Sequence, residues 1–428
     1  MVVWPISGCD CGCRDQELRR SSFLAVLPRL RSAIRLLNAE PGVRRLLVLA
    51  AVTRLHGGGL GLAVILLIEE VSGSIATAGL ATGLLSLGIG LTRPLQGYLI
   101  DRFGLPTLGV CAALHAVFAV TLLIVGVERA GASALALIFA LGFSTPAISV
   151  ATRASWAAHV RARDQPAVFG VDTASLDLAL AVGPLIAGLL AAAAGPAEAL
   201  GALVAIGCLG TSAMMIVAPA TVDVRRTSHT RGFHALIPAL AASVGFGLIY
   251  GSIGVTTVAW VLDDGRPGLA GPIFALIFAG SVIGDLLLAP RRADLPLRRR
   301  LQRRLLVLVA ATSLLPASPG VALLAIGVAI TGAALANASI TLLLDIAART
   351  PGGLRAQAFG WAGATLRVGH AAGAAAAGVL VEAIGPRPAL LLSALGATLA
   401  LVALIEKRPV LPRGETDDRP ASGGQRPR

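Results

Sequence analysis

Ionisable side chains that fall inside long apolar runs are the residues of this chain best suited to do chemistry. A charge in hydrocarbon costs about 3 kcal/mol or more, so such a side chain faces a partner or a polar cavity. At a helical rise of about 1.5 Å per residue, several of these groups lie near the middle of their runs. We take five as candidates for binding a ligand or a proton: Arg54, His56, Asp177, Arg367 and His370.

Asp177 and Arg367 are an acid and a base from different halves of the chain. Together they can bind a zwitterionic or polar ligand, or they can form a charge pair that is made and broken as the protein changes conformation. Asp177 or His56 can also carry a proton, because burial disfavours the charged form of both groups. The residues alone leave these alternatives open.

The other ionisable groups in apolar runs have simpler explanations as well. Asp172 and Asp285 can snorkel or form structural pairs, and Arg93 fits a snorkelling arginine. His115 fits a lone packed histidine. Further polar or aromatic residues can complete a cavity, although many hydroxyls will bond to their own helix. The candidates are Ser144, Thr145, Ser149, Thr152, Tyr250, Thr256, Thr257, Trp260, Asn337, Ser339 and Thr341.

The composition identifies the elements that position these groups. Hydrophobic residues make up 55% of the 428 residues and charged residues only 14%, and the mean hydropathy is +0.80. In a soluble chain, the net charge of +13 would suggest a nucleic-acid partner, but this hydropathy is typical of a membrane protein. Windows of about 20 apolar residues predict twelve transmembrane helices. They cover 46–68, 75–100, 107–127, 132–152, 167–194, 199–218, 236–262, 268–290, 303–318, 320–346, 357–384 and 388–405.

Basic residues are distributed unevenly between the loops that join these helices. Outside the two tails, sixteen lie in loops on the side of the N-terminus and three in the opposite loops. Loops rich in Arg and Lys stay in the cytoplasm. We therefore expect a multi-pass protein of the cytoplasmic (inner) membrane with both termini cytoplasmic, which also favours twelve crossings over eleven.

The chain repeats itself at an offset of 190 residues. The Phe-Gly pair at 169 recurs at 359, and Asp177 falls on Arg367. The repeat predicts an all-α membrane protein built from two pseudo-symmetric six-helix bundles. The expected parts are a basic cytoplasmic segment with an interfacial helix or a frayed tail (1–45), the bundles (46–218 and 236–406), a cytoplasmic linker (219–235) and a disordered cytoplasmic tail (407–428).

The loop after the second predicted helix contains Gly97-Tyr98-Leu99-Ile100-Asp101-Arg102-Phe103-Gly104. This run resembles the G-x-x-x-D-[RK]-x-G signature of the major facilitator superfamily (MFS), whose fold has twelve transmembrane helices. Helix number, orientation and repeat extend the resemblance from about residue 43 to residue 407. It implies a cytoplasmic gate formed by Gly97, Asp101, Arg102 and Gly104. Leu105-Pro106 replaces the basic end of the signature.

The fifth predicted helix contains Gly183-Pro184-Leu185-Ile186-Ala187-Gly188. This run is similar to the G-P-x-x-G-G element of antiporters in the same superfamily, with Ala187 as a departure. The fourth helix also lacks the superfamily's R-x-x-Q-G sequence. We interpret Gly183, Pro184 and Gly188 as hinge or packing residues.

The resemblance implies a secondary active transporter that moves a small organic solute by alternating access, with proton-coupled export as the expected mode. An importer or uniporter of a polar metabolite is the alternative. A membrane sensor or embedded enzyme is disfavoured, because the chain has no H-E-x-x-H, G-x-S-x-G or nucleotide-binding Gly-Lys motif. We expect a monomer in the bilayer that is no enzyme and binds no nucleic acid. We also expect no cofactor or metal, since no histidine completes a site at Cys9, Cys11 and Cys13.

Overall fold

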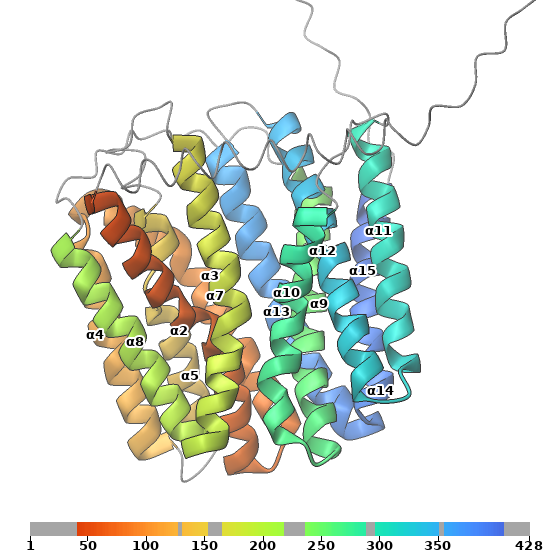
Figure 1. Ribbon diagram of the computed structural model, residues 1–428, viewed down its shortest axis with the longest axis horizontal. Helices are drawn as coiled ribbons and strands as arrows, with labels where there is room; N and C mark the ends of the chain where they lie inside the picture. The colour runs from red at the N-terminus through yellow and green to blue at the C-terminus, as the bar shows by residue number, and fades with distance from the viewer. Residues whose placement is uncertain are drawn as a thin grey trace, which may run out of the picture.

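The computed structural model describes residues 41–126, 131–152, 165–217, 236–287, 296–350 and 355–405. These residues form an all-α bundle of twelve long helices, when α14 is counted with α15 (Figure 1). The predicted helix number is thus confirmed. The helices are α2 (Pro41–Ser72), α3 (Ile75–Phe103), α4 (Pro106–Thr121, followed by a π-helical turn, Leu122–Gly126), α5 (Ala132–Ser144), α7 (Gln165–Ala194), α8 (Pro196–Val217), α9 (Ile237–Asp263), α10 (Ala270–Leu287), α11 (Leu297–Leu314), α12 (Val321–Arg349), α13 (Arg355–Ile384), α14 (Pro386–Ala389) and α15 (Leu391–Ile405).

Eleven of the described helices are long and apolar enough to cross a membrane, and α11 is the exception. It begins at Leu297, before the predicted residue 303, and takes a run of arginines into its first turns. Two of these arginines bond to carbonyls of neighbouring helices. Arg298 donates to Leu404 at 3.2 Å and Arg304 to Asn337 at 2.8 Å. Such contacts let the charged turns join the bundle, which hydropathy alone does not reveal.

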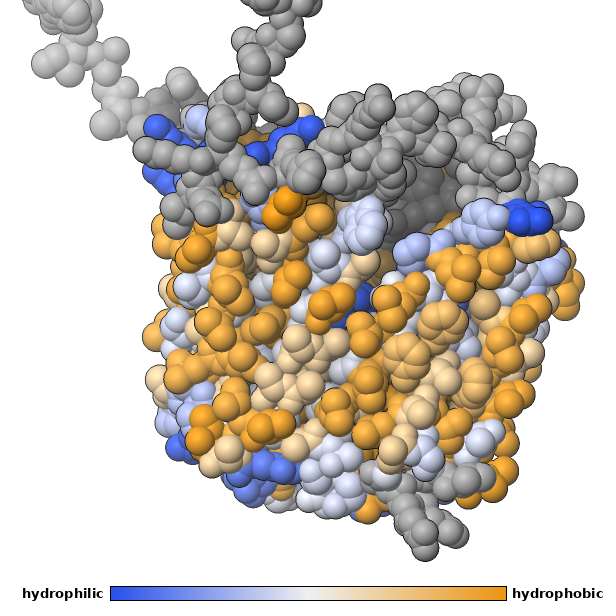
Figure 2. All heavy atoms as spheres, turned by 180° about the vertical axis from the view of Figure 1, so that it is seen from behind, coloured by the Kyte–Doolittle hydropathy of each residue, from blue (hydrophilic) through white to orange (hydrophobic). Residues whose placement is uncertain are grey.

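The first and last described helices identify the two ends of the bundle. Helix α2 begins and α15 ends at the same end, at the top of Figure 1, which we call the terminal face. The other end is the opposite face. On the side of the molecule seen in Figure 2, hydrophobic residues cover the wall between these faces, and hydrophilic residues gather toward them. This is the pattern of a helix bundle that crosses a bilayer.

Corresponding turns reveal the internal repeat in the backbone. Gly195, between α7 and α8, and Gly385, between α13 and α14, both have a positive φ, at 119° and 85°. Each is followed by a proline that opens the next helix. A side chain would be strained at such a φ, so glycine suits both turns. The two turns are 190 residues apart, as the sequence repeat requires.

Helices pack through small residues both within each half of the bundle and between the halves. We call α2–α8 the N-terminal half and α9–α15 the C-terminal half. Helices α9 and α13 lie so close that a Cβ added to Gly247 would come within 1.9 Å of the Leu366 carbonyl oxygen, and one added to Gly369 within 2.0 Å of the Val244 oxygen. The halves meet where α3 packs on α13 and α7 packs on α10. These close contacts hold the helices that bound the central cavity described below.

Some predicted features lie outside the described residues. They are the interfacial helix and cysteines of segment 1–45 up to residue 40, the linker 219–235 and the tail 407–428. The predicted fourth helix is also interrupted. Helix α5 ends at Ser144, Pro146 follows, and helical backbone returns at 148–152.

Candidate functional site

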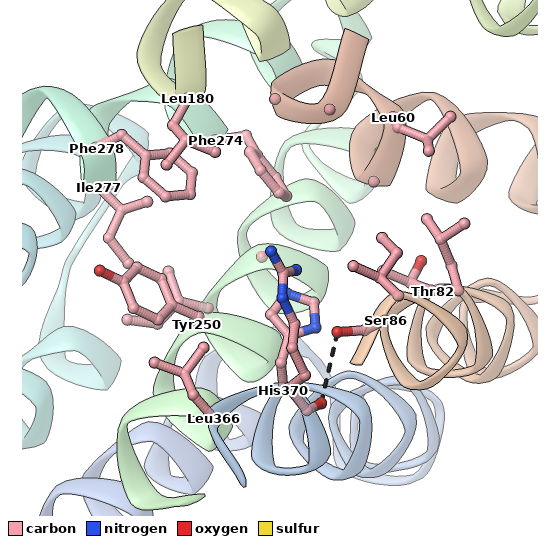
Figure 3. Close-up of a pocket in the computed structure, with 18 of the residues that line it drawn as sticks. Leu60, Thr82, Ser86, Leu180, Tyr250, Phe274, Ile277, Phe278, Leu366 and His370 are labelled. Atoms are coloured by element: carbon pink, nitrogen blue, oxygen red, sulfur yellow. Dashed lines mark hydrogen bonds between the residues drawn. The ribbon is translucent and has the colours of Figure 1, made fainter. Parts of the chain in front are cut away.

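A cavity of about 250 Å³ lies between the two halves of the bundle (Figure 3). Three helices from each half line it, namely α2, α3 and α7 and then α9, α10 and α13. Aliphatic and aromatic side chains form most of the wall, with a few polar groups among them. The polar and titratable side chains in the lining are Thr82, Ser86, Asp177, Tyr250, Thr257, Ser281, Arg367 and His370.

Three of the five candidate residues share this cavity. Asp177 reaches it from α7, and Arg367 and His370 reach it from successive turns of α13. Asp177 and Arg367 thus face one space from corresponding positions of the repeat. No ion pair joins the two within the described residues. The cavity therefore presents an acid and a base from opposite halves.

Arg54 lies elsewhere, inside the N-terminal half. Its guanidinium forms an ion pair with Asp172 at 2.8 Å, and both side chains are almost fully buried. It also donates to the Ser175 hydroxyl at 2.7 Å and to the Thr152 hydroxyl at 3.0 Å. These bonds tie α2 to α7 and to the end of the fourth transmembrane segment. Asp172 thus forms a structural pair, one of the explanations that its sequence position left open.

His56 also points away from the cavity and contacts His115. Their Nε2 atoms are 2.8 Å apart, and the rings meet edge to face with centroids 4.8 Å apart. Nδ1 of His115 lies 2.9 Å from the Leu141 carbonyl oxygen. Because that carbonyl only accepts, Nδ1 of His115 carries the proton and its Nε2 accepts from His56. The interpretation of His115 as a lone histidine is therefore wrong.

The remaining polar candidates divide in the same way. Tyr250 and Thr257 line the cavity, whereas the candidates on α5 and α12 do not. Thr152 bonds to Arg54, and Thr341 bonds to Arg304. Sequence reasoning missed the aromatic pair Phe274 and Phe278 on α10 and the hydroxyl pair on α3. Phe274 and Phe278 are four residues apart, as are Thr82 and Ser86, so each pair lies on one helix face. This spacing was the signal in the sequence that could have identified them.

The glycines of α2 have roles that their sequence spacing did not indicate. Gly57 and Gly61 resemble a helix-packing pair, yet a Cβ on either would meet nothing within 4 Å, and both line the cavity. Gly58 and Gly59 pack instead. A Cβ on Gly58 would lie 2.2 Å from the Ala179 carbonyl oxygen, and one on Gly59 would lie 2.6 Å from that of Gly183. The face of α2 that contacts α7 is therefore turned by one residue from the face that carries Gly57 and Gly61.

The halves touch along the part of the cavity wall that leads to the opposite face. A Cβ on Gly79 of α3 would lie 2.5 Å from the Ala374 oxygen of α13, and one on Gly188 of α7 would lie 2.7 Å from Gly271 Cα of α10. The described helices of the two halves are therefore in direct contact toward the opposite face.

The loop motif lies where α3 ends at the terminal face. Gly104 has a φ of 74° and ends the helix by donating its N–H to the Ile100 carbonyl at 2.8 Å. Arg102 donates to the Tyr98 hydroxyl at 3.0 Å and lies over the Phe103 ring at 5.2 Å. The side chain of Asp101 lies outside what the structure describes.

The proline element of α7 lies between two helices. A Cβ on Gly183 would approach the Gly59 nitrogen of α2 to 2.6 Å. One turn on, Pro184 and Gly188 face Gly271 of α10, since a Cβ on Gly271 would lie 2.8 Å from the Pro184 oxygen. The element thus borders both the N-terminal half and the seam with the C-terminal half.

Comparison with solved structures identifies the fold. The nucleoside transporter NupG is 14% identical, with a TM-score of 0.68 over 86% of this chain and 100% of that chain. The POT family transporter PepTSo is 12% identical, with a TM-score of 0.65 over 85% and 96%. The human organic anion transporter MFSD10 is 16% identical, with a TM-score of 0.59 over 85% and 100%. No curated protein sequence matches the chain.

The sequence profile of the Major Facilitator Superfamily matches residues 46–345. This match covers more than half of the chain and includes helices of both halves, and the solved structures above share the fold. The resemblance carried by the loop motif is confirmed. With a cavity between two helical halves, this chain belongs to the Major Facilitator Superfamily and is a secondary transporter of small solutes.

Proposed function

We propose that this chain exports a small organic solute from the cytoplasm through the central cavity, by alternating access coupled to protons. The observation that carries the proposal is the cavity itself, bounded by three helices of each half and lined by Asp177 and Arg367. In transporters built from two repeats, a site between the halves can face either side as the halves rock.

Asp177 supports the coupling to protons. It is the carboxylate in the described lining, and a carboxylate that meets water on alternate sides can take up a proton on one side and release it on the other. Arg367 faces the same space, so a change in the charge of Asp177 alters the electrostatic balance that a bound solute meets. Asp177 is therefore the residue through which we expect protons and solute to be linked.

Two features support the direction of export. The Gly183-Pro184 element is similar to that of antiporters, and loop arginines predict that the terminal face is cytoplasmic. With that orientation, the contacts between the halves close the cavity toward the outside, as in the state in which an exporter takes up its solute.

The test is flux in proteoliposomes with an imposed proton gradient and a pH-sensitive dye inside. We expect a panel of small organic solutes to include members whose flux follows the gradient and changes internal pH. Asp177→Asn should abolish the solute-driven pH change, and Arg367→Gln should lower flux by about tenfold or more.

Arg266→Gln is the control, because Arg266 is 62% exposed at the opposite face and pairs only with its neighbour Asp264. If no panel member moves and internal pH stays constant, the proton-coupled proposal fails. Unchanged flux in both cavity variants would reduce Asp177 and Arg367 to packing residues.

A further inference from the structure

The strongest hydrogen-bond donor that the described cavity lining offers to a solute lies on α13. Thr82, Thr257 and Ser281 each donate to a carbonyl one turn back in their own helix, at 2.9, 2.6 and 2.9 Å. A hydroxyl has one proton, so these three retain only acceptor capacity. The Arg367 guanidinium, with five N–H donors, bonds to none of the described residues. A solute therefore finds its strongest donor at Arg367.

A second arginine and a buried histidine lie near this donor. His370, one turn along α13, lies within electrostatic range of Arg367, and its Nδ1 is buried without a hydrogen-bond partner. Arg93 of α3 is also within electrostatic range of Arg367, and it donates to the Pro146 carbonyl at 3.4 Å. Asp177 is the acidic group in the described lining. This arrangement favours a bound anion, because a guanidinium without a counterion inside a membrane protein is costly.

An aromatic wall lies next to these donors. The rings of Tyr250 and Phe278 are stacked, with centroids 5.7 Å apart and planes 11° apart. Phe274 extends the wall, with its centroid 6.4 Å from that of Phe278. Figure 3 shows Tyr250 and Phe278 on one side of the cavity, Thr82 and Ser86 on the other, and Phe274 and His370 between them. A planar ring gains from stacking on such a wall in addition to being buried.

The size of the cavity favours a compact solute. Gly57 and Gly61 present bare backbone to the cavity, so this part of the wall has no side chains that could adjust to a ligand. The volume of about 250 Å³ is below the range of about 300 to 1,000 Å³ that holds drug-sized ligands. The site thus combines an anion-binding group with an aromatic surface in a small space.

We propose that the substrate class of this cavity is the compact aromatic carboxylates. The carboxylate accepts hydrogen bonds from Arg367, and the ring packs against Tyr250 and Phe278. This inference rests on the proposed function, in that the central cavity is taken as the solute site.

The test is equilibrium binding by calorimetry to the full chain in lipid nanodiscs, without a proton gradient. The probes are 2-naphthoate, its neutral analogue 2-naphthamide, the non-aromatic anion cyclohexanecarboxylate and the cation 2-naphthylmethylamine. We expect 2-naphthoate to bind about tenfold more tightly than 2-naphthamide, because charge-assisted hydrogen bonds are the stronger ones. It should also exceed cyclohexanecarboxylate, and the cation should not bind.

Substitutions test which residues cause the preference for 2-naphthoate. Arg367→Gln should remove the preference for 2-naphthoate, because it weakens 2-naphthoate far more than 2-naphthamide, and Arg367→Lys should restore part of the preference. Phe278→Leu should weaken 2-naphthoate more than cyclohexanecarboxylate. Arg266→Gln should bind all probes as the wild type does, since it lies outside the cavity.

Equal affinities for 2-naphthoate and 2-naphthamide would overturn the inference, as would preferred binding of the cation, no binding of any probe, or an unchanged preference in Arg367→Gln and Arg367→Lys alike. Because no gradient is applied, the result is independent of proton coupling. Selective binding of 2-naphthoate together with flux that ignores the proton gradient would count against the proposed function alone.

Discussion

Glu382, at the end of α13, binds the residue that caps the start of α3 in the other half. Its Oε1 accepts from the Ser74 hydroxyl at 2.6 Å and from the Ala76 N–H at 3.0 Å. Ser74 is the N-cap of α3. The carboxylate therefore lies at the positive end of a helix, where a negative charge is stabilised. This contact joins the halves at the opposite face, where the cavity is closed.

Glu382→Gln should loosen this closure. The amide keeps the acceptor but loses the charge that favours the helix end, so states open at the opposite face become about two- to fivefold more populated. The measurement is the modification rate of Thr82→Cys, in a chain without its native cysteines, by an impermeant thiol reagent added at that face. Glu198→Gln is the matched control, because Glu198 lies in the first turn of α8 within one half. Equal rates in the two variants would contradict a closing role for Glu382.

Asp101→Asn should act in the reverse direction. By resemblance to the superfamily signature, Asp101 closes the gate at the terminal face by facing the start of α13, whose free N–H groups attract a carboxylate. Without that charge, the terminal face stays open longer and the Thr82→Cys reporter is modified more slowly from the opposite face. Asp264→Asn, in a loop at the opposite face, serves as the control. An accessibility pattern identical to that of the parent chain would refute the gate role.

The two kinds of glycine on α2 should respond differently to substitution. Gly61→Ala should fold and transport normally, and Gly61→Leu should fold but block flux, because the added side chain occupies the open cavity. Gly58→Ala should lower the yield of folded protein, since its Cβ would overlap the Ala179 carbonyl. Size-exclusion profiles report folding, and proteoliposome flux reports blockage. A Gly58→Ala chain as stable as wild type would show that α2 and α7 can separate at this contact.

The pair of Arg54 and Asp172 should be needed for stability. Arg54→Leu alone removes the buried counterion of Asp172 and should cost about 3 to 5 kcal/mol in thermal or denaturant unfolding. The double variant Arg54→Leu with Asp172→Leu should cost less than the sum of the two single changes, because neither charge is then stranded. Additive losses would mean that the two residues act independently.

Much of the architecture could be predicted from the sequence, because it depends on length and periodicity. Apolar runs of sufficient length predicted twelve helices, and the repeat predicted that Asp177 and Arg367 occupy corresponding places; both line the cavity. The start of α11 could not be predicted in this way. Its arginines join the bundle through carbonyls of α12 and α15, which belong to distant parts of the chain.

The sequence could not predict which polar residues interact with each other inside the membrane. Asp172 and Asp177 are five residues apart on α7, which turns them by about 140° around the helix. One therefore meets Arg54 and the other the cavity, but only packing decides which. The same holds for His56 and His115, which come from helices whose relative rotation the sequence does not fix.

The seams between the halves have a kinetic consequence. Where α3 meets α13 and α7 meets α10, backbone touches backbone at Gly79, Gly188 and Gly271, with no side chains inserted between. Interlocked side chains would have to leave their rotamers before the helices could part, and each such step adds to an activation barrier. A glycine seam has no such steps. Different residues can thus set the stability of the closed face and the rate at which it opens. Contacts such as that of Glu382 set the free energy of closure. The glycines, which place no side chains at these contacts, set the opening rate.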